Sequence, residues 1–258
     1  MPFIGNFYWV KSKKVYESPK MHKIKSFKEE IKMSDKINNE TQKNNSQLQN
    51  IKELGVTNIP QQRNSPIQIL PIIGQIEGHV VLPSETKSTK YEHVIPNLIA
   101  VESDSSVKGL LVVLNTVGGD VEAGLAISEM IRSLSKPTVS LVIGGGHSIG
   151  VPLATASDYS FISPTATMIV HPIRMTGMVI GVPKTFEYFS KMQDRINEFI
   201  VRTSNITEKK LIELMLQTDE LLNDTGTILI GKQAVQQGLI DEVGGISEAL
   251  KKLNDMIK

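Results

Sequence analysis

The 258-residue sequence contains no cysteine. Disulfide bonds, thiolate metal sites and a cysteine nucleophile are therefore excluded, and the lack of disulfides fits a reducing compartment such as the cytoplasm. The five histidines are scattered along the chain, without the spacing of a metal site. We predict a cytoplasmic protein that uses no metal and no other cofactor.

The chain also lacks a strong net charge and a long apolar run. Its 28 lysine and arginine residues face 27 aspartate and glutamate residues, a formal net charge of +1, so the overall charge does not indicate a nucleic-acid partner. No apolar run approaches the roughly 18 residues that a transmembrane helix needs. At the N-terminus, MPFIGNFYWVKSKK places its lysines after the apolar residues, which is the reverse of a secretory signal peptide.

Residues 1–64 differ in composition from the rest of the chain. They hold 12 lysine and arginine residues against six acidic residues, a local excess of +6, and include the amide-rich stretch NNETQKNNSQLQN. Such a segment buries too little apolar surface to offset the entropy lost on ordering, so we predict a mostly disordered tail. Aromatic residues beside lysines at its start are compatible with weak contact to an anionic membrane surface. An unattached cationic tail is the simpler interpretation.

From residue 65 onward the pattern becomes that of an α/β domain, 65–258. Continuous apolar runs indicate buried strands, and the segments IQILPIIGQI and HVVL indicate shorter strands. Helical spacing lies between the strands, with Asp120 and Thr207 in position to cap two of the helices. The predicted buried strands are 108–116, 138–145 and 166–172, and the predicted helices are 91–103, 118–134, 151–157, 183–204, 207–217 and 246–257. Alternating strands and helices predict a sheet covered by helices.

Two glycine clusters, Gly118–Gly119 and Gly144–Gly146, follow buried strands. In parallel sheets, ligand sites gather at the carboxyl ends of the strands, where glycine lets a substrate approach backbone amides closely. Ser148 follows the second cluster, at a predicted turn from strand to helix, because Pro152 is best tolerated in the first turn of a helix. The Ser148 hydroxyl is therefore either a nucleophile or the N-cap of that helix, and this stretch alone leaves both open.

His171 directly follows an apolar strand and precedes Pro172, which places its imidazole at a strand end too. Histidine is the side chain best suited to accept the proton of a serine hydroxyl near neutral pH. A lone histidine in such a place is more often a hydrogen-bonded core residue. Ser148 and His171 at neighbouring strand ends together favour a catalytic pair.

Two further patterns match known motifs only in part. GHSIG resembles the nucleophile elbow of α/β hydrolases, but His171 is the last histidine and lies only 23 residues after Ser148, whereas that fold needs an acid and then a histidine well after the serine. GTILIGKQ resembles a phosphate-binding loop, but Gln233 replaces the serine or threonine that would hold magnesium. We therefore predict neither an α/β-hydrolase nor a nucleotide-binding protein.

Four segments resemble, in order and spacing, the ClpP-type serine peptidases: LNTVGGDVEAGLAI, GGGHSIGVPLATA, MIVHP and AVQQGLIDEV. The likeness covers about residues 65–257 and is greatest to the branch of that family called TepA. It implies a crotonase-like superhelical α/β domain with a helical handle at 184–204, through which two rings stack. It also implies a peptidase that hydrolyses polypeptides inside a homo-oligomeric ring.

The resemblance assigns a role to four residues. Ser148 is similar to the family's nucleophile and His171 to its general base. Gly119 and Ile149 match the residues whose backbone amides form the oxyanion hole.

The sequence departs from the family pattern at three places, the last of which is the absence of the family's glutamine between His171 and Pro172. The family's aspartate falls on Gly226, where no acid exists, so Asp224 or Asp219 is the candidate to orient the base if the loop is rearranged. His147 replaces a small residue immediately before the nucleophile. The first departure leaves the acid of the triad open between Asp224, Asp219 and none.

Three functions are compatible with these residues. The first is a ClpP-like peptidase that degrades or processes polypeptides, presecretory ones included, with a separate ATPase as partner because the chain has no ATPase motif. The second is a catalytically weak scaffold or translocation helper. The third is a crotonase-type acyl-CoA enzyme, against which the Ser–His pair counts. A Ser–Lys dyad using Lys184 or Lys191 is a variant of the first.

Overall fold

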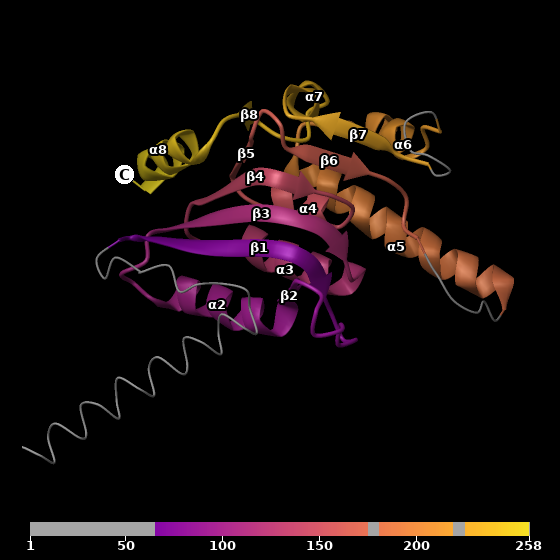
Figure 1. The fold of residues 1–258 in the computed structure, drawn as a ribbon, viewed down its shortest axis with the longest axis horizontal. Helices are drawn as coiled ribbons and strands as arrows, with labels where there is room; N and C mark the ends of the chain where they lie inside the picture. The colour runs from indigo at the N-terminus through magenta and orange to yellow at the C-terminus, as the bar shows by residue number, and fades with distance from the viewer. Residues whose placement is uncertain (1–64, 175–180, 219–224, 258) are drawn as a thin grey trace, which may run out of the picture. The chain divides into compact units, whose positions relative to one another are not determined.

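The computed structural model describes residues 65–174, 181–218 and 225–257. The tail predicted for residues 1–64 lies outside this part of the chain. The described residues form an α/β fold, as the alternating strand and helix patterns predict (Figure 1). The strands are β1 (Ile67–Glu77), β2 (Ser88–Lys90), β3 (Gly109–Gly119), β4 (Thr138–Gly146), β5 (Tyr159–Ile162), β6 (Thr167–Val170), β7 (Thr227–Ile230) and β8 (Glu242–Val243). The helices are α2 (Tyr91–Ser103), α3 (Val121–Arg132), α4 (Gly150–Thr155), α5 (Val182–Thr203), α6 (Glu208–Met215), α7 (Lys232–Gln236) and α8 (Ile246–Ile257).

The main sheet has the strand order β2-β1-β3-β4-β5-β8, and each neighbouring pair is parallel. Strand β6 leaves this sheet: it pairs with β4 only where Gly145 meets Thr167, and it pairs antiparallel with β7. The carboxyl ends of β3, β4 and β6 therefore come together at one edge. This is the edge at which the sequence places its glycine clusters and His171.

Strand β3 is buried on both faces, as its continuous apolar run predicts. Leu110, Val112 and Leu114 belong to the large core beneath α2, α3 and α4. Leu111 belongs to a second core on the other face, where Leu253 of α8 packs. Burial of one strand by helices on both faces is typical of parallel sheets, because helical crossovers cover both sides.

Local signals in the sequence correctly located several helix ends. The Asp120 carboxylate caps α3 by accepting from the Ala123 amide at 2.8 Å, and the Thr207 hydroxyl caps α6 by accepting from the Lys210 amide at 3.3 Å. The strand predicted at HVVL (79–82) was wrong. These residues form a loop in which Val81 is 79% exposed, because a four-residue apolar run with no partner strand cannot bury its side chains.

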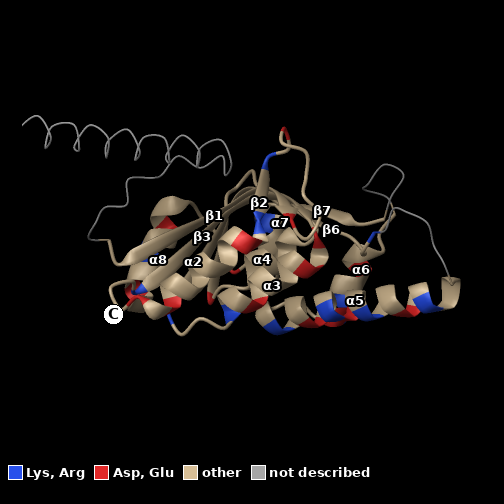
Figure 2. Ribbon diagram, turned by 90° about the horizontal axis from the view of Figure 1, so that it is seen from below, with Lys and Arg blue, Asp and Glu red and all other residues tan. Residues whose placement is uncertain are grey.

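Helix α5 is the segment predicted as the handle, 184–204, and it extends away from the sheet (Figure 1). Its second half is anchored: Met192 is buried, and Arg195 pairs with Glu122 of α3 at 2.7 Å. Its first half is exposed, with Phe186 at 74%. Basic and acidic residues alternate along the helix (Figure 2). No helix among the described residues is both long and apolar enough to span a membrane.

Candidate active site

Ser148 lies in the turn between β4 and α4, and its backbone has a φ of +57°. It is the one non-glycine residue with positive φ in the described part of the chain. A left-handed conformation costs an L-residue about 1–2 kcal/mol and persists where the surroundings hold it. Here the Ser148 amide donates to the Ile169 carbonyl at 2.9 Å, and the Ser148 carbonyl accepts from the Val151 amide at 2.9 Å. Both backbone groups of this strained residue are therefore fixed.

The interpretation of Ser148 as a helix N-cap is wrong. The N-cap of α4 is Ile149, and no side chain caps that helix. The Ser148 hydroxyl instead faces the pocket described below. A strained serine whose hydroxyl does not stabilise the helix is better explained by chemistry than by helix capping.

The end of β3 approaches the Ser148 turn so closely that only glycine fits. Gly118 has a φ of +91°, and a Cβ built there would lie 2.7 Å from the Ser148 Cβ. Gly119 has a φ of +150°, and a Cβ there would lie 2.2 Å from the Ile76 carbonyl oxygen. The glycines that the sequence pattern identified therefore allow the β3 backbone to line the site at Ser148.

Thr116 connects the two glycine loops, a role that the sequence analysis missed. Its hydroxyl donates to the Gly74 carbonyl at 2.6 Å and accepts from the Gly118 amide at 3.1 Å. Its carbonyl accepts from the His147 amide at 3.2 Å. The neighbouring Asn115 accepts from the Gly145 amide at 2.9 Å. The signal in the sequence was two polar residues ending an otherwise apolar strand.

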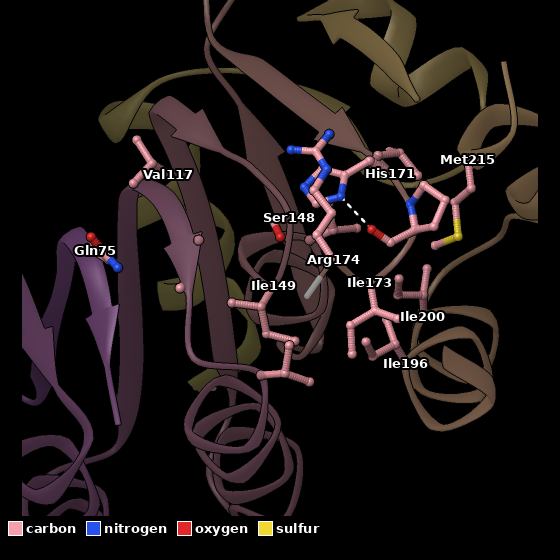
Figure 3. Close-up of a pocket in the computed structure, with 16 residues that line it drawn as sticks. Gln75, Val117, Ser148, Ile149, His171, Ile173, Arg174, Ile196, Ile200 and Met215 are labelled. Carbon is pink, nitrogen blue, oxygen red and sulfur yellow. Dashed lines mark hydrogen bonds between the residues drawn. The ribbon is translucent and has the colours of Figure 1, made fainter. Parts of the chain in front are cut away.

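Ser148 and His171 line the same pocket, which has a volume of about 330 Å³ (Figure 3). Gly118, Gly119 and Ile149 also line it. The rest of its wall is mostly apolar, with Gln75 and Arg174 as polar exceptions. The apolar residues are Val117, Val121, Val151, Val170, Pro172, Ile173, Ile196, Ile200 and Met215. The pocket therefore brings together a hydroxyl, an imidazole, glycine backbone and an apolar wall.

His171 follows the end of β6, and its ring is half-buried. Its Nδ1 lies 2.7 Å from the Pro172 carbonyl oxygen (Figure 3). A carbonyl can only accept, so Nδ1 is the protonated nitrogen and, in the neutral ring, Nε2 is the basic one. The arrangement gives His171 the tautomer that a general base needs.

His147, which precedes the nucleophile candidate, is a second histidine at this edge. Its Nε2 lies 2.8 Å from the Thr167 hydroxyl oxygen of β6. Burial lowers the pKa of His147, and the charge of His171 lowers that pKa further. The two imidazoles are therefore electrostatically coupled, and His147 is neutral at pH 7.

The acid of the predicted triad is not located. Asp219 and Asp224 lie outside the described residues. Gly226, at the position of the family's aspartate, has a φ of +140° and donates its amide to the Gln217 carbonyl at 2.7 Å. Glycine is favoured by this backbone, so an acidic side chain at position 226 would be strained.

The lysines considered for a Ser–Lys dyad do not line the pocket. Lys184 and Lys191 are exposed on α5, and Lys184 pairs with Glu187 at 2.8 Å. In the described part of the chain, the hypothesis of a Ser–Lys dyad with either lysine is therefore wrong. Within the same part of the chain, no three histidine, aspartate or glutamate side chains gather into a group that could hold a metal ion.

Comparison with known proteins gives a consistent result. A translocation-enhancing protein TepA from Halalkalibacterium halodurans is 56% identical over 211 residues, 82% of this chain and 82% of that protein. An ATP-dependent Clp protease proteolytic subunit 2 from Treponema denticola is 26% identical over 168 residues, 64% of this chain and 80% of that protein. An ATP-dependent Clp protease proteolytic subunit from Streptococcus pneumoniae is 26% identical over 170 residues, 64% of this chain and 83% of that protein.

The family model named Clp protease matches residues 67–247, a range that contains β1, the Ser148 turn and His171. The relative that is 56% identical places the chain in the TepA branch of this family. The chain belongs to the Clp protease family.

Proposed function

We propose that the chain is a serine endopeptidase in which Ser148 is the nucleophile and His171 the general base. One observation carries the proposal: a serine held at positive φ and a histidine whose Nδ1 is engaged by a carbonyl line one pocket. Strained residues gather at functional sites, and a tautomer fixed at Nδ1 leaves Nε2 to act as the base.

The reaction follows from these roles. His171 Nε2 takes the hydroxyl proton as Ser148 Oγ attacks the peptide carbonyl carbon, and the carbonyl oxygen becomes an oxyanion. The imidazolium then gives its proton to the leaving amine, which leaves an acyl-enzyme. Water, deprotonated by the same imidazole, hydrolyses the acyl-enzyme and restores the serine. Asp224, or Asp219 in its place, would stabilise the imidazolium.

Backbone amides support the oxyanion assignment. In the turn, the amides of His147, Ser148, Gly150 and Val151 each donate to a backbone carbonyl, and among the described residues the Ile149 amide does not. That amide begins a helix, where N–H groups point outward. Gly119 and Ile149 line the same pocket. We assign both amides to the oxyanion, a role in which one donor contributes about 10²–10³ to turnover.

The pocket wall suggests the kind of substrate. Its apolar side chains come from several elements, Ile196 and Ile200 on α5 and Met215 on α6 among them. A concave apolar site with few polar groups favours an apolar ligand side chain. We therefore propose polypeptides cleaved next to an apolar residue.

The relatives suggest the wider setting. Two are described as ATP-dependent proteolytic subunits and one as translocation-enhancing. By analogy we propose a homo-oligomeric ring in the cytoplasm that works with a separate ATPase and assists the processing or translocation of presecretory proteins. This part of the proposal rests on the similarity to these relatives and not on the geometry of the pocket.

Labelling by a fluorophosphonate tests the peptidase proposal. Wild-type protein should be labelled on Ser148 and should cleave an apolar fluorogenic peptide, and Ser148→Ala should do neither. Ser140→Ala, at a serine buried in the middle of β4, is the matched control. Wild-type protein that is assembled yet unlabelled would overturn the proposal.

A second candidate function is a translocation helper with little or no catalysis. The observation that favours it is glycine at position 226, in a backbone conformation unsuited to an acid. Complementation of a deletion strain decides between the two. Full rescue by Ser148→Ala supports the helper, whereas failure of that variant to rescue supports the peptidase.

A further inference from the structure

Strand β6, which precedes His171, makes few hydrogen bonds to β4 and to the turn that contains Ser148. Strand β6 pairs with β4 only where Gly145 meets Thr167, whereas β3 pairs with β4 along most of its length. The Ser148 amide adds a bond to the Ile169 carbonyl. The relative position of Ser148 and His171 therefore depends on few hydrogen bonds, and loss of any one of them should change it.

The His147 side chain supplies one of those interactions. Its Nε2 lies 2.8 Å from the Thr167 hydroxyl. The rest of the residue is fixed on the nucleophile side, because its amide donates to the Thr116 carbonyl at 3.2 Å and its carbonyl accepts from the Gly150 amide at 2.8 Å. His147 thus joins the turn before Ser148 to the strand before His171.

The ring is also confined by packing. A Cβ added to Gly145 would lie 3.2 Å from both Cε1 and Nε2 of His147, so the ring lies directly over the Gly145 backbone. The ring is half-buried. Confinement lowers the entropy cost of the bond to Thr167, since the side chain has few other positions to occupy.

The electrostatic environment of His147 favours a positioning role for this residue over a role as a second general base. Among the described residues, His171 is the ionisable group whose charge acts on His147. The side chain to which the ring is hydrogen-bonded, Thr167 of β6, is uncharged. Because His147 is neutral at pH 7, it adds no positive charge to oppose the imidazolium that forms on His171 during the reaction.

We propose that His147 is a positioning residue that holds β6 against the nucleophile turn through its hydrogen bond to Thr167, and so sets the approach of His171 to Ser148. Its effect on rate rests on the proposed peptidase function, whereas the bond itself does not. The small residue found in the family pattern at this position could not make the bond, so the device is specific to sequences that carry the histidine.

The test uses the full chain and substitutions at both ends of the bond. Thr167→Val removes the hydroxyl and keeps the shape, and Thr167→Ser restores a hydroxyl. The matched control is Thr165→Val, at an exposed threonine two residues earlier. The first measurement is NMR of the ¹⁵N-labelled histidine rings, which reports the tautomer of His147 without any need for activity. The second is kcat and KM on an apolar peptide, with melting temperature as a check on folding.

Thr167→Val should convert His147 from one tautomer to a mixture and lower kcat by about ten- to a hundredfold with KM unchanged, as expected when reacting groups are misplaced. Thr167→Ser and Thr165→Val should keep the wild-type values. An unchanged His147 tautomer in Thr167→Val, or equal loss of kcat in the valine and serine variants, would overturn the proposal. If wild-type protein neither cleaves peptide nor labels, the peptidase function fails, and the NMR comparison still decides whether the bond exists.

Discussion

The Ser148 amide donates a hydrogen bond to the carbonyl of Ile169, two residues before His171. The backbone of the proposed nucleophile is thus bonded directly to the strand that delivers the proposed base. Ser148 makes this bond in a left-handed conformation, with φ at +57°. The position of Ser148 relative to His171 is therefore fixed in part by a backbone hydrogen bond.

Ser148→Gly should be more stable than Ser148→Ala by about 1 kcal/mol, because glycine adopts positive φ without strain. The control is the same pair of substitutions at Ser128, which is buried within α3. There the order should reverse by a similar amount, since alanine is the better helix former. Chemical denaturation measures both differences. Equal stability of the two Ser148 variants would contradict the strain.

Gly118→Ala should reduce fluorophosphonate labelling by at least about tenfold, because the new Cβ would lie 2.7 Å from the Ser148 Cβ. Gly181→Ala is the matched control: its φ is also positive, at +73°, but nothing lies within 4 Å of a Cβ there. Both variants should lose stability from backbone strain, and Gly118→Ala should lose more because its Cβ also meets the Ser148 turn. Only Gly118→Ala should lose labelling, and a full labelling rate in that variant would argue against the close approach of β3.

Asp224→Asn should lower kcat by about 10³–10⁴-fold if this carboxylate orients His171, since the amide cannot stabilise the imidazolium. Asp219→Asn tests the alternative acid in the same assay. Asp104→Asn, on an exposed carboxylate at the end of α2, is the control and should have no effect. Activity that survives both substitutions would mean that His171 works without either acid.

His147 should make the fold less stable in acid. Its pKa is lowered in the folded chain, first by burial and then by His171, so the unfolded chain binds a proton at higher pH than the folded chain does. The stabilisation is complete above about pH 6.5, the unfolded value, and declines as pH falls through the folded pKa. Melting temperatures between pH 7.5 and 5 should therefore fall more steeply for wild type than for His147→Gln.

The exposed histidine of α2 provides the control for that comparison. His93→Gln, which removes an exposed histidine far from the turn in sequence, is measured beside His147→Gln. Identical acid slopes for His147→Gln and wild type would mean that His147 is not perturbed by folding.

Phe186→Glu should weaken assembly without unfolding the domain. The outer half of α5 exposes Val182 (68%), Phe186 (74%) and Tyr188 (55%), and a group of exposed large apolar side chains is the kind of surface that favours a protein contact. Sedimentation velocity should show smaller species, with circular dichroism unchanged. Glu198→Lys, a charge change at an exposed position on the anchored half of the same helix, is the control. Unchanged sedimentation of Phe186→Glu would exclude α5 as the contact between copies.

The sequence by itself determined the order and ends of most elements. A continuous apolar run identified the doubly buried β3, and cap chemistry located the starts of α3 at Asp120 and α6 at Thr207, because these signals act over a few neighbouring residues. It also identified Ser148, His171 and the glycines around them, since residue type and position at strand ends suggest chemistry. Burial of HVVL could not be judged in this way, because it depends on a partner strand.

Only the tertiary structure decided how these residues meet. The pairing of Gly145 with Thr167, the hydroxyl of Thr116 between two loops and the positive φ of Ser148 all depend on contacts between segments that are distant along the chain. No local pattern encodes such contacts, because they form only when the β3, β4 and β6 ends pack at one edge. The sequence therefore supplied the candidate catalytic residues, and the packing of three strand ends set their geometry.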